Sequence, residues 1–450
     1  MRSTFTTIAF ALGLLTAPAV SAETLADALT SAYENSGLLE QNRALLRAAD
    51  EDVAIAVAAT LPVISWAASA TAQEPRTPGS DDIEVSARIS AELTLYDGGA
   101  NQLAIAAQKE VVLGTRAALV AVEQQILQRA VEAYLNVRRD TEFVALRQNN
   151  VRLITQELRA AEDRFEVGEV TRTDVSLAQA RLASARSLLA SAQGNLAVSV
   201  EEFRAAVGRA PNNPRPVGPA PLARNVAEAK AFALRNHPSL IEAQHAVSAA
   251  ELNVQRAEAA IKPRVSVSGT LGVDGNGDTG SQIGLNLSGP IYQGGRLTAQ
   301  VRQFMARRDA SRANLHTAAI AIQQQVGNAY ALLEVARASS AASDQQVRAA
   351  TVAFRGVREE ATLGARTTLD VLNAEQEQLN AQANLISAQA DEVVSSYAVL
   401  AAMGLLTAEH LRLPVQTYDP EAYYNLVKDA PTRLSRQGQA LDRVLNSIGD

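Results

Sequence analysis

The sequence predicts a mainly α-helical protein with a small antiparallel β portion, built from two structural repeats. The motif G-x-x-T-x-x-D-V occurs at 168–175 and again, 196 residues later, at 364–371. Residues 115–167 and 365–403 contain neither Gly nor Pro, as expected of long helices that meet at a turn. Apolar and polar residues alternate strictly at 83–95, which is typical of a strand with one apolar face.

The composition favours an exported protein and argues against several functional classes. Residues 1–22 contain Arg2, an apolar run and the small residues Val20-Ser21-Ala22, which together predict a cleaved signal peptide. The mean hydropathy of −0.04 excludes a bundle of membrane-spanning helices. A net charge of −7 argues against nucleic acid as a partner. Because the chain has no Cys, disulfides, thiolate metal sites and a lipid-anchored N-terminal Cys are excluded.

Self-comparison divides the chain into two repeats. Tyr134 and Gly208 each have a counterpart 196 residues later, whereas upstream of Pro62 the offset is 201, so a surface loop of different length is expected between Pro62 and Tyr96. The predicted parts are a signal peptide at 1–22, repeat 1 at 23–210, a proline-rich linker at 211–224, repeat 2 at 225–412 and a C-terminal tail at 413–450. In each repeat we expect a helical run (24–60, 225–261), a β-hairpin (about 62–96, about 263–292) and a long helical hairpin with its tip at 168–174 or 364–370.

The predicted strands have one face that is compatible with lipid. Ile83, Ile89 and Leu95 lie on the apolar face of the longest strand, and Val265–Val273 repeat the pattern. Strands of this length cross a bilayer when tilted, but an open sheet edge cannot face lipid. Four strands are too few to close a barrel. We therefore expect strands to be pooled between subunits, and three chains would supply twelve.

The long helices are expected to pack as coiled coils. Gly99–Val167 would extend about 100 Å if it were helical throughout. After each tip the apolar residues recur with alternating spacings of three and four, through Val175, Ala178 and Leu182 in the first copy and through Leu372, Gln376 and Leu379 in the second. This period of 3.5 residues predicts a coiled-coil seam.

Two interpretations of the tips remain open. Thr171-x-x-Asp174 and Thr367-x-x-Asp370 have the spacing of capping boxes, which alone would explain both carboxylates. In a symmetric oligomer, the copies of each Asp from all subunits would instead form a ring of negative charge around a pore. Arg366 and Arg172 are near enough in sequence to form charge-assisted hydrogen bonds that hold such tips together. The candidate tip residues are Gly168, Thr171, Asp174, Gly364, Arg366, Thr367 and Asp370.

A second repeated motif, Y-x-G-G, follows each predicted β-hairpin. On one interpretation the motif is a strand end with flexible glycines. On the other it is the site where a barrel strand bends into a helix, with its tyrosine in an interfacial aromatic belt. The two interpretations are compatible. The candidate junction residues are Tyr96, Gly98, Gly99, Tyr292, Gly294 and Gly295.

We find no constellation of residues that supports an enzyme, a cofactor site or a metal site. The four histidines stand singly, and neither a nucleophile elbow nor a phosphate-binding loop occurs. Asp274, Asn276 and Asp278 have calcium-loop spacing, but Thr279 and Leu285 replace the Gly and Glu that such a loop requires. A turn between strands is a sufficient explanation.

The chain resembles the TolC family of outer-membrane efflux and secretion channels. The resemblance rests on L-Y-D-G-G at 95–99, I-Y-Q-G-G at 291–295, the two tip motifs and L-D-V-L-N-A-E-Q-E-Q-L-N-A at 369–381, and it extends over 24–412. It implies a homotrimer whose 12-stranded outer-membrane barrel continues into a periplasmic α-helical tunnel. It also implies a periplasmic adaptor (membrane fusion) protein and an inner-membrane pump of ABC or RND type. The tail sequence Y-D-P-E-A-Y-Y at 418–424 resembles family members that serve type I protein secretion.

The same resemblance implies roles for individual tip residues. Asp370 would lie in an acidic ring at the periplasmic entrance, and Asp174 and Arg366 would form bonds that hold the entrance closed. Asn373 stands where a second acidic residue often occurs, and Ala361 replaces an aromatic residue. We therefore expect fewer closing bonds and a lower affinity for cations.

The predicted function is a passive duct for type I protein secretion, drug efflux or both, without a catalytic step. Its location would be the outer membrane, in contact with lipid, with the tunnel in the periplasm. The alternative, supported by the heptads alone, is a periplasmic coiled-coil adaptor or scaffold protein. The strand hairpins discriminate between the two, because an adaptor needs no hairpins with a lipid-compatible face.

Overall fold

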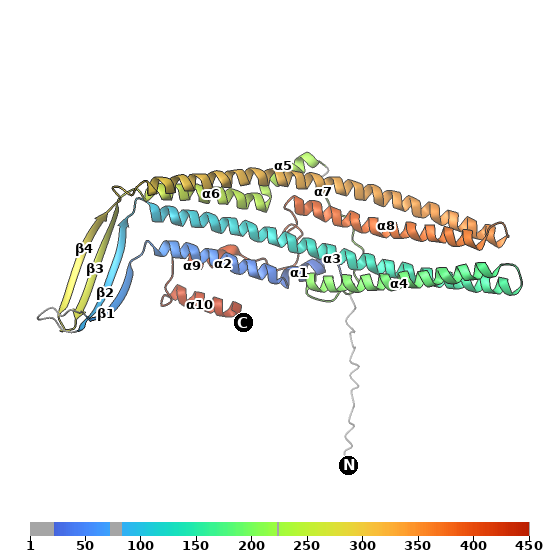
Figure 1. The fold of residues 1–450 in the computed structure, drawn as a ribbon, viewed down its shortest axis with the longest axis horizontal. Helices are drawn as coiled ribbons and strands as arrows, with labels where there is room; N and C mark the ends of the chain where they lie inside the picture. The colour runs from blue at the N-terminus through green and yellow to red at the C-terminus, as the bar shows by residue number, and fades with distance from the viewer. Residues whose placement is uncertain (1–21, 73–82, 223–224, 450) are drawn as a thin grey trace, which may run out of the picture.

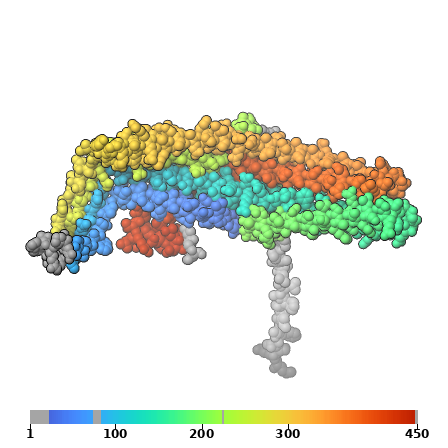
Figure 2. Space-filling view, in the orientation of Figure 1, coloured from blue at the N-terminus to red at the C-terminus, as the bar shows by residue number. Residues whose placement is uncertain are grey.

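The computed structural model describes residues 22–72, 83–222 and 225–449. The molecule is elongated, with a β-sheet at one end and two helical tips at the other (Figures 1 and 2). It is mostly helical with one small antiparallel sheet, which confirms the predicted fold class at that level. The predicted signal peptide lies outside the described residues, apart from Ala22, and so does the loop of the first hairpin, 73–82.

Each of the two predicted entry runs is divided into two helices. Repeat 1 begins with α1 (Leu25–Glu34) and α2 (Gly37–Ala58), and repeat 2 begins with α5 (Val226–Asn236) and α6 (Pro238–Ala259). Ser36 caps α2 by accepting a hydrogen bond from the backbone N–H of Leu39. Pro238 starts α6, where its missing N–H costs no helical hydrogen bond. Pro238 cannot continue α5 as a regular helix, and Ser36 caps a new helix after α1.

The sheet joins both repeats in the order β1-β2-β3-β4. Its strands are β1 (Val63–Ala72), β2 (Ile83–Tyr96), β3 (Arg264–Asp274) and β4 (Thr279–Ser288), and all neighbours are antiparallel. The register places Trp66 opposite Ile89, and Ile89 opposite Leu271, on one face. On the opposite face Ser65 and Ser90 are hydrogen-bonded at 2.8 Å. The sheet therefore has one apolar and one polar face.

The apolar face of the sheet is uncovered in the single chain. Trp66 is 80% exposed, Ile283 86% and Leu287 73%. Within the described residues β1 and β4 each pair with one strand only, so both edges are open. In Figure 1 the sheet projects from the end of the helical body, and no helix lies against its faces. Large exposed apolar surface of this kind marks a site of contact with lipid or with another chain.

The turn between β3 and β4 is closed by Asp274. Its Oδ1 accepts hydrogen bonds from the backbone N–H groups of Asn276, at 3.0 Å, and Asp278, at 2.9 Å. An Asp side chain that binds the backbone two residues ahead is a common turn device. The calcium-like spacing in this segment is thus explained by the turn.

Two long helical hairpins form the body. Repeat 1 supplies α3 (Ala100–Glu166) and α4 (Arg172–Val207), and repeat 2 supplies α7 (Arg296–Thr362) and α8 (Thr368–Ala402). The longer helices have 67 residues each, about 100 Å at 1.5 Å per residue. Figure 1 shows the two hairpins side by side, and α3 also packs against α8. Among the described helices none is long and apolar enough to cross a membrane.

The predicted coiled-coil seam is correct in part. Ala178, Leu182 and Leu379 are buried as expected. Leu369, which lies three residues before Leu372 and belongs to the same predicted seam, is 42% exposed. In the second copy the buried side chain is Glu375 rather than the adjacent Gln376. The prediction failed there because α8 packs against α3 as well as α7, which turns a wider face of the helix inward than a two-helix seam does.

The main core lies midway along the body, where α1 and the end of α4 pack against α3. Tyr134 is fully buried there beside Leu127, Phe203 and Val207. Its hydroxyl shares its single proton between the backbone carbonyls of Glu23, at 3.0 Å, and Arg215, at 2.9 Å. One side chain of α3 therefore holds both the start of repeat 1 and the linker to repeat 2.

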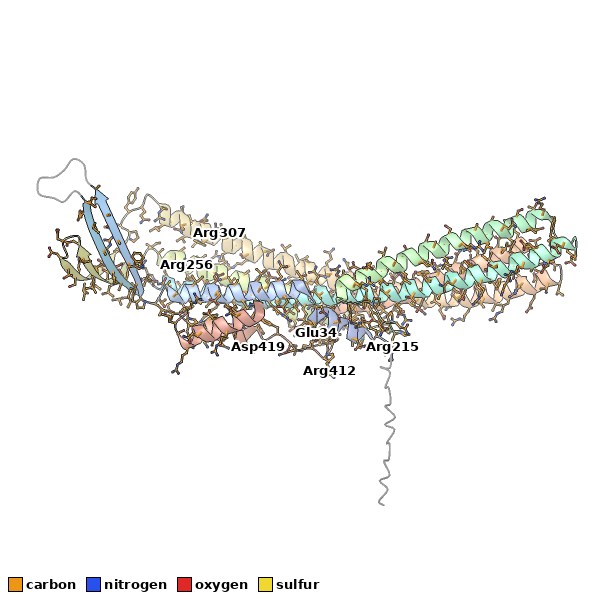
Figure 3. The ribbon with its side chains drawn as sticks, turned by 90° about the horizontal axis from the view of Figure 1, so that it is seen from below. Glu34, Arg215, Arg256, Arg307, Arg412 and Asp419 are labelled. Carbon is orange, nitrogen blue, oxygen red and sulfur yellow. The ribbon has the colours of Figure 1, made fainter. Side chains whose placement is uncertain are left out.

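The C-terminal tail folds back onto α2 and α3. It contains α9 (Pro420–Val427) and α10 (Arg436–Gly449), and Figure 3 shows Asp419, the N-cap of α9, beside these helices. The Tyr423 hydroxyl donates to Glu51 at 2.7 Å, and the Arg116 guanidinium lies 5.5 Å from the centre of the Tyr424 ring. The tail is thus a packed part of the fold.

Candidate functional site at the helical tips

The two tips are built by the same backbone turn. Gly168 and Gly364 have φ angles of 79° and 75°, a left-handed conformation that favours glycine. After α3 the backbone N–H of Glu169 donates to the carbonyl of Arg164 at 2.9 Å. After α7 the N–H of Ala365 donates to the carbonyl of Glu360 at the same distance. These bonds end the long helix and direct the chain into the return helix within a few residues.

Each return helix begins with a complete capping box. The Thr171 backbone N–H donates to Asp174 Oδ2 at 2.9 Å, and the Asp174 N–H donates to Thr171 Oγ1 at 3.3 Å. Thr367 and Asp370 repeat these bonds at 3.0 and 3.2 Å. Hydrogen bonds from Thr171 lower the pKa of Asp174, and hydrogen bonds from Thr367, assisted by the charge of Arg366, lower the pKa of Asp370. Both carboxylates are therefore ionised at neutral pH, and each accepts hydrogen bonds within its own capping box.

Arg366 is bonded within its own tip. Its Nε donates to Glu360 Oε2 at 2.8 Å, and this bond raises the pKa of the guanidinium. Asp174 and Arg366 line the same groove of about 760 Å³ between the two tips, but no bond between them is present in the single chain. A bond from Arg366 to the tip of a neighbouring subunit stays a prediction.

Three polar contacts join the two helical hairpins near the tips, and none of them was predicted from the sequence. We call them the cross-hairpin contacts. Asn150 Nδ2 donates to Glu375 Oε1 at 2.8 Å, Arg181 Nη2 donates to Asn373 Oδ1 at 3.1 Å, and Arg358 Nη2 lies 3.6 Å from Glu157 Oε1. Asn373, expected to weaken the site because it is not acidic, therefore bonds a residue of the other repeat. Arg181, Asn373 and Glu375 each lie beside a predicted seam position, and this was the only signal in the sequence. Asn150, Glu157 and Arg358 lie in the helices before the tips, where no seam had been predicted.

The junction residues lie where the sheet meets the long helices. Gly98 approaches the end of α6 so closely that an added Cβ would lie 3.0 Å from the carbonyl oxygen of Ala259. The same Cβ would lie 2.8 Å from Cβ of Lys262, just beyond the helix, and Lys262 Nζ donates to the Gly98 carbonyl at 3.2 Å. Asp97 accepts from the N–H groups of Gly99 and Asn101, at 2.9 and 2.7 Å, and so caps α3. In repeat 2, Gly294 precedes Gly295, the N-cap of α7.

The two junction tyrosines are exposed. Tyr96 is 51% exposed and Tyr292 is 87% exposed, at the end of the sheet nearest the body. This placement agrees with an interfacial position, because tyrosine rings are enriched at the boundary between lipid and water. Their contact with lipid stays a prediction.

Comparison with known proteins gives a consistent result. The model of the family described as "Outer membrane efflux protein" matches residues 28–209 and 232–405. The outer membrane efflux protein BepC of Brucella suis biovar 1 is 37% identical over 427 residues, which cover 92% of this chain and 93% of that protein. The alkaline protease secretion protein AprF of Pseudomonas aeruginosa is 26% identical over 60% of this chain and 59% of its own length.

Solved structures show the same fold. The outer membrane protein VceC of Vibrio cholerae superimposes with a TM-score of 0.73 at 22% identity, covering 84% of this chain and 96% of that one. Each of the two segments matched by the family model contains one hairpin tip and one half of the sheet. This chain is a member of the outer membrane efflux protein family, with relatives in the TolC group.

Proposed function

We propose that this chain is one subunit of a homotrimeric, passive export channel that crosses the outer membrane and continues through the periplasm. The observation that carries the proposal is the four-stranded sheet, which has an uncovered apolar face and two open edges. An open edge cannot face lipid, because its backbone groups would lack hydrogen-bond partners. Joining β4 of one subunit to β1 of the next around a threefold axis removes every edge and gives a 12-stranded barrel.

The helical body supports the periplasmic part of the proposal. The two helices of 67 residues in each subunit are long enough to continue the barrel as a tunnel of about 100 Å. The tunnel would end at the tips, where three copies of Asp370 form an acidic ring and Asp174 and Arg366 bond neighbouring tips. A periplasmic adaptor protein and an inner-membrane pump of ABC or RND type would open these tips and supply the energy.

The cargo class follows from the relatives and is part of the proposal. BepC is named an efflux protein and AprF an alkaline protease secretion protein. We propose drug efflux, type I protein secretion or both for this chain. Comparing secreted proteins and drug sensitivity in a deletion strain separates the two: loss of one secreted protein without a change in drug sensitivity would indicate secretion.

Membrane fractionation combined with chemical cross-linking tests the channel itself. We expect the chain in the outer-membrane fraction, a cross-linked species at three times the mass of one chain, and discrete conductance steps when the protein is added to a planar lipid bilayer. A monomer in the soluble periplasmic fraction would contradict the proposal and favour the adaptor alternative.

A further inference from the structure

A buried carboxylate lies at the interface between the two helical hairpins. Glu375 on α8 is 4% exposed, and its bonding partner Asn150 on α3 is 6% exposed. Asn150 Nδ2 donates to Oε1, whereas Oε2 has no hydrogen-bond partner among the described residues. A buried charged group with an unpaired oxygen is costly unless it takes up a proton. This position is not one of the capping or tip residues discussed above.

The surroundings of Glu375 leave its negative charge poorly compensated. Glu375 lines a groove of about 620 Å³ together with Leu146, Leu153 and Leu379, so much of its environment is apolar. The charged groups that face it are Glu157 on α3, Arg358 on α7 and Arg181 on α4. None of them bonds Glu375, because Arg358 lies against Glu157 and Arg181 donates to Asn373.

We infer that Glu375 is a proton-responsive positioning residue, which holds the two hairpins together when protonated and favours their separation when ionised. A protonated carboxyl needs no charge compensation and keeps the Asn150 bond. An ionised carboxylate is better solvated when α8 moves away from α3 and water enters the interface. For the proposed channel, on which this inference rests, such separation near the tips would widen the entrance.

The direction of the pH dependence follows from the burial of this group. Burial raises the pKa of Glu375 from 4.5 to about 7, with Glu157 adding to the rise and Asn150, Arg358 and Arg181 opposing it. The packed arrangement therefore binds the proton more tightly than the separated one. Its stability is greatest below pH 4.5, falls as the pH rises toward 7 and then levels off. Between pH 5 and pH 8 the ratio of separated to packed hairpins should rise by more than about tenfold.

Hydrogen–deuterium exchange of residues 370–386, in the detergent-solubilised full-length protein, tests this inference. At pH 8 the Glu375→Gln variant, which mimics the protonated side chain, should exchange roughly tenfold more slowly than the wild type. At pH 5 the difference between the two rates should be much smaller than at pH 8. Because each comparison is made at one pH, the intrinsic pH dependence of exchange cancels.

Two further variants complete the experiment. Glu377→Gln removes an exposed carboxylate from the same helix and should match the wild type at both pH values. Glu375→Leu, a second uncharged variant, should also exchange more slowly than the wild type at pH 8. Equal rates for wild type and Glu375→Gln at pH 8, or faster exchange of the variant, would overturn the inference. No bilayer is used, so a failed channel assay and a failed exchange prediction are separate results.

Discussion

Asp174 and Asp370 each have a local role that is complete within one chain. Each carboxylate accepts hydrogen bonds from its own Thr, so capping explains its position without a neighbouring subunit. They differ in one neighbour, because the positive charge of Arg366 acts on Asp370 and the capping box of Asp174 has no such partner. A role in closing the entrance must therefore be added to the capping role, and an experiment has to separate the two.

The double variant Asp174→Ala with Arg366→Ala should raise single-channel conductance in a planar bilayer, because bonds between neighbouring tips would be lost. The matched control is Asp27→Ala. Asp27 forms the same kind of capping box with Thr24 in α1, far from the tips, so its loss costs a similar cap, about 1 kcal/mol, without touching the entrance. Unchanged conductance in the double variant would return Asp174 and Arg366 to purely structural roles.

Tyr134→Phe should destabilise the fold by about 1–3 kcal/mol, because the buried Arg215 carbonyl loses its donor, whereas the Glu23 carbonyl keeps the hydrogen bond from the Arg215 N–H. A lower apparent Tm in thermal unfolding measures this effect. Tyr292→Phe is the control, since Tyr292 is 87% exposed and its hydroxyl is open to solvent. Equal Tm values for the two variants would show that the Tyr134 hydroxyl contributes nothing to stability.

At the scale of elements, the two repeats resemble each other in their internal contacts as well as in their sequences. An added Cβ on Gly208, after α4, would lie 2.7 Å from Asn35 Cβ, at the α1–α2 break. On Gly404, after α8, it would lie 3.2 Å from the Cα of His237, at the α5–α6 break. The offset of 196 pairs Gly208 with Gly404, and the offset of 201 upstream of Pro62 pairs Asn35 with Asn236. The elements were predictable because their turns, caps and periods are local properties of the sequence.

Gly98→Ala tests the junction between sheet and helix. Gly98 has a φ of 72° and close neighbours in Lys262, whereas Gly99 has a φ of 90° and nothing within 4 Å of an added Cβ. Both variants incur the left-handed backbone cost of about 1–2 kcal/mol, and Gly98→Ala adds about 1–3 kcal/mol of overpacking. The apparent Tm should fall further for Gly98→Ala than for Gly99→Ala. A larger fall in apparent Tm for Gly99→Ala than for Gly98→Ala would mean that the structure around Gly98 can make room for an added Cβ.

At the scale of the whole molecule, the packing of one helical hairpin against the other could not be predicted from the sequence. The period of α8 predicted a seam with α7, but the side of α8 that meets α3 depends on how the hairpins lie together, which no local pattern encodes. For this reason Glu375 was assigned no role, and Asn373 was interpreted only as the loss of an acid. The strands, in contrast, had their faces assigned correctly as far as Thr94, because a side-chain period of two fixes both faces once one residue is placed. After Thr94 the register shifts, and Tyr96 rather than Leu95 lies opposite Val265.

The proposed closure of the barrel makes a prediction about strand edges that a cysteine scan can test. The chain has no native Cys, so an engineered pair reports without background. Ser65 on β1 lies on the polar face, and on β4 the same face carries Gln282, Gly284 and Asn286. Ser65→Cys, combined with single cysteines along β4, should give disulfide-linked trimers only at positions of that face. Cysteines at Ile283, Leu285 and Leu287 point to the opposite face and should not cross-link.

This alternation separates a closed barrel from other ways of bringing chains together. Side chains of paired strands approach closely only when they lie on the same face of the sheet, with Cβ atoms about 4.5–5.5 Å apart. A contact between sheets stacked face to face would instead favour cysteines on the apolar face. Cross-linking at Ile283 and Leu285, or dimers in place of trimers, would therefore contradict edge-to-edge closure and leave the uncovered apolar face to be explained by another assembly.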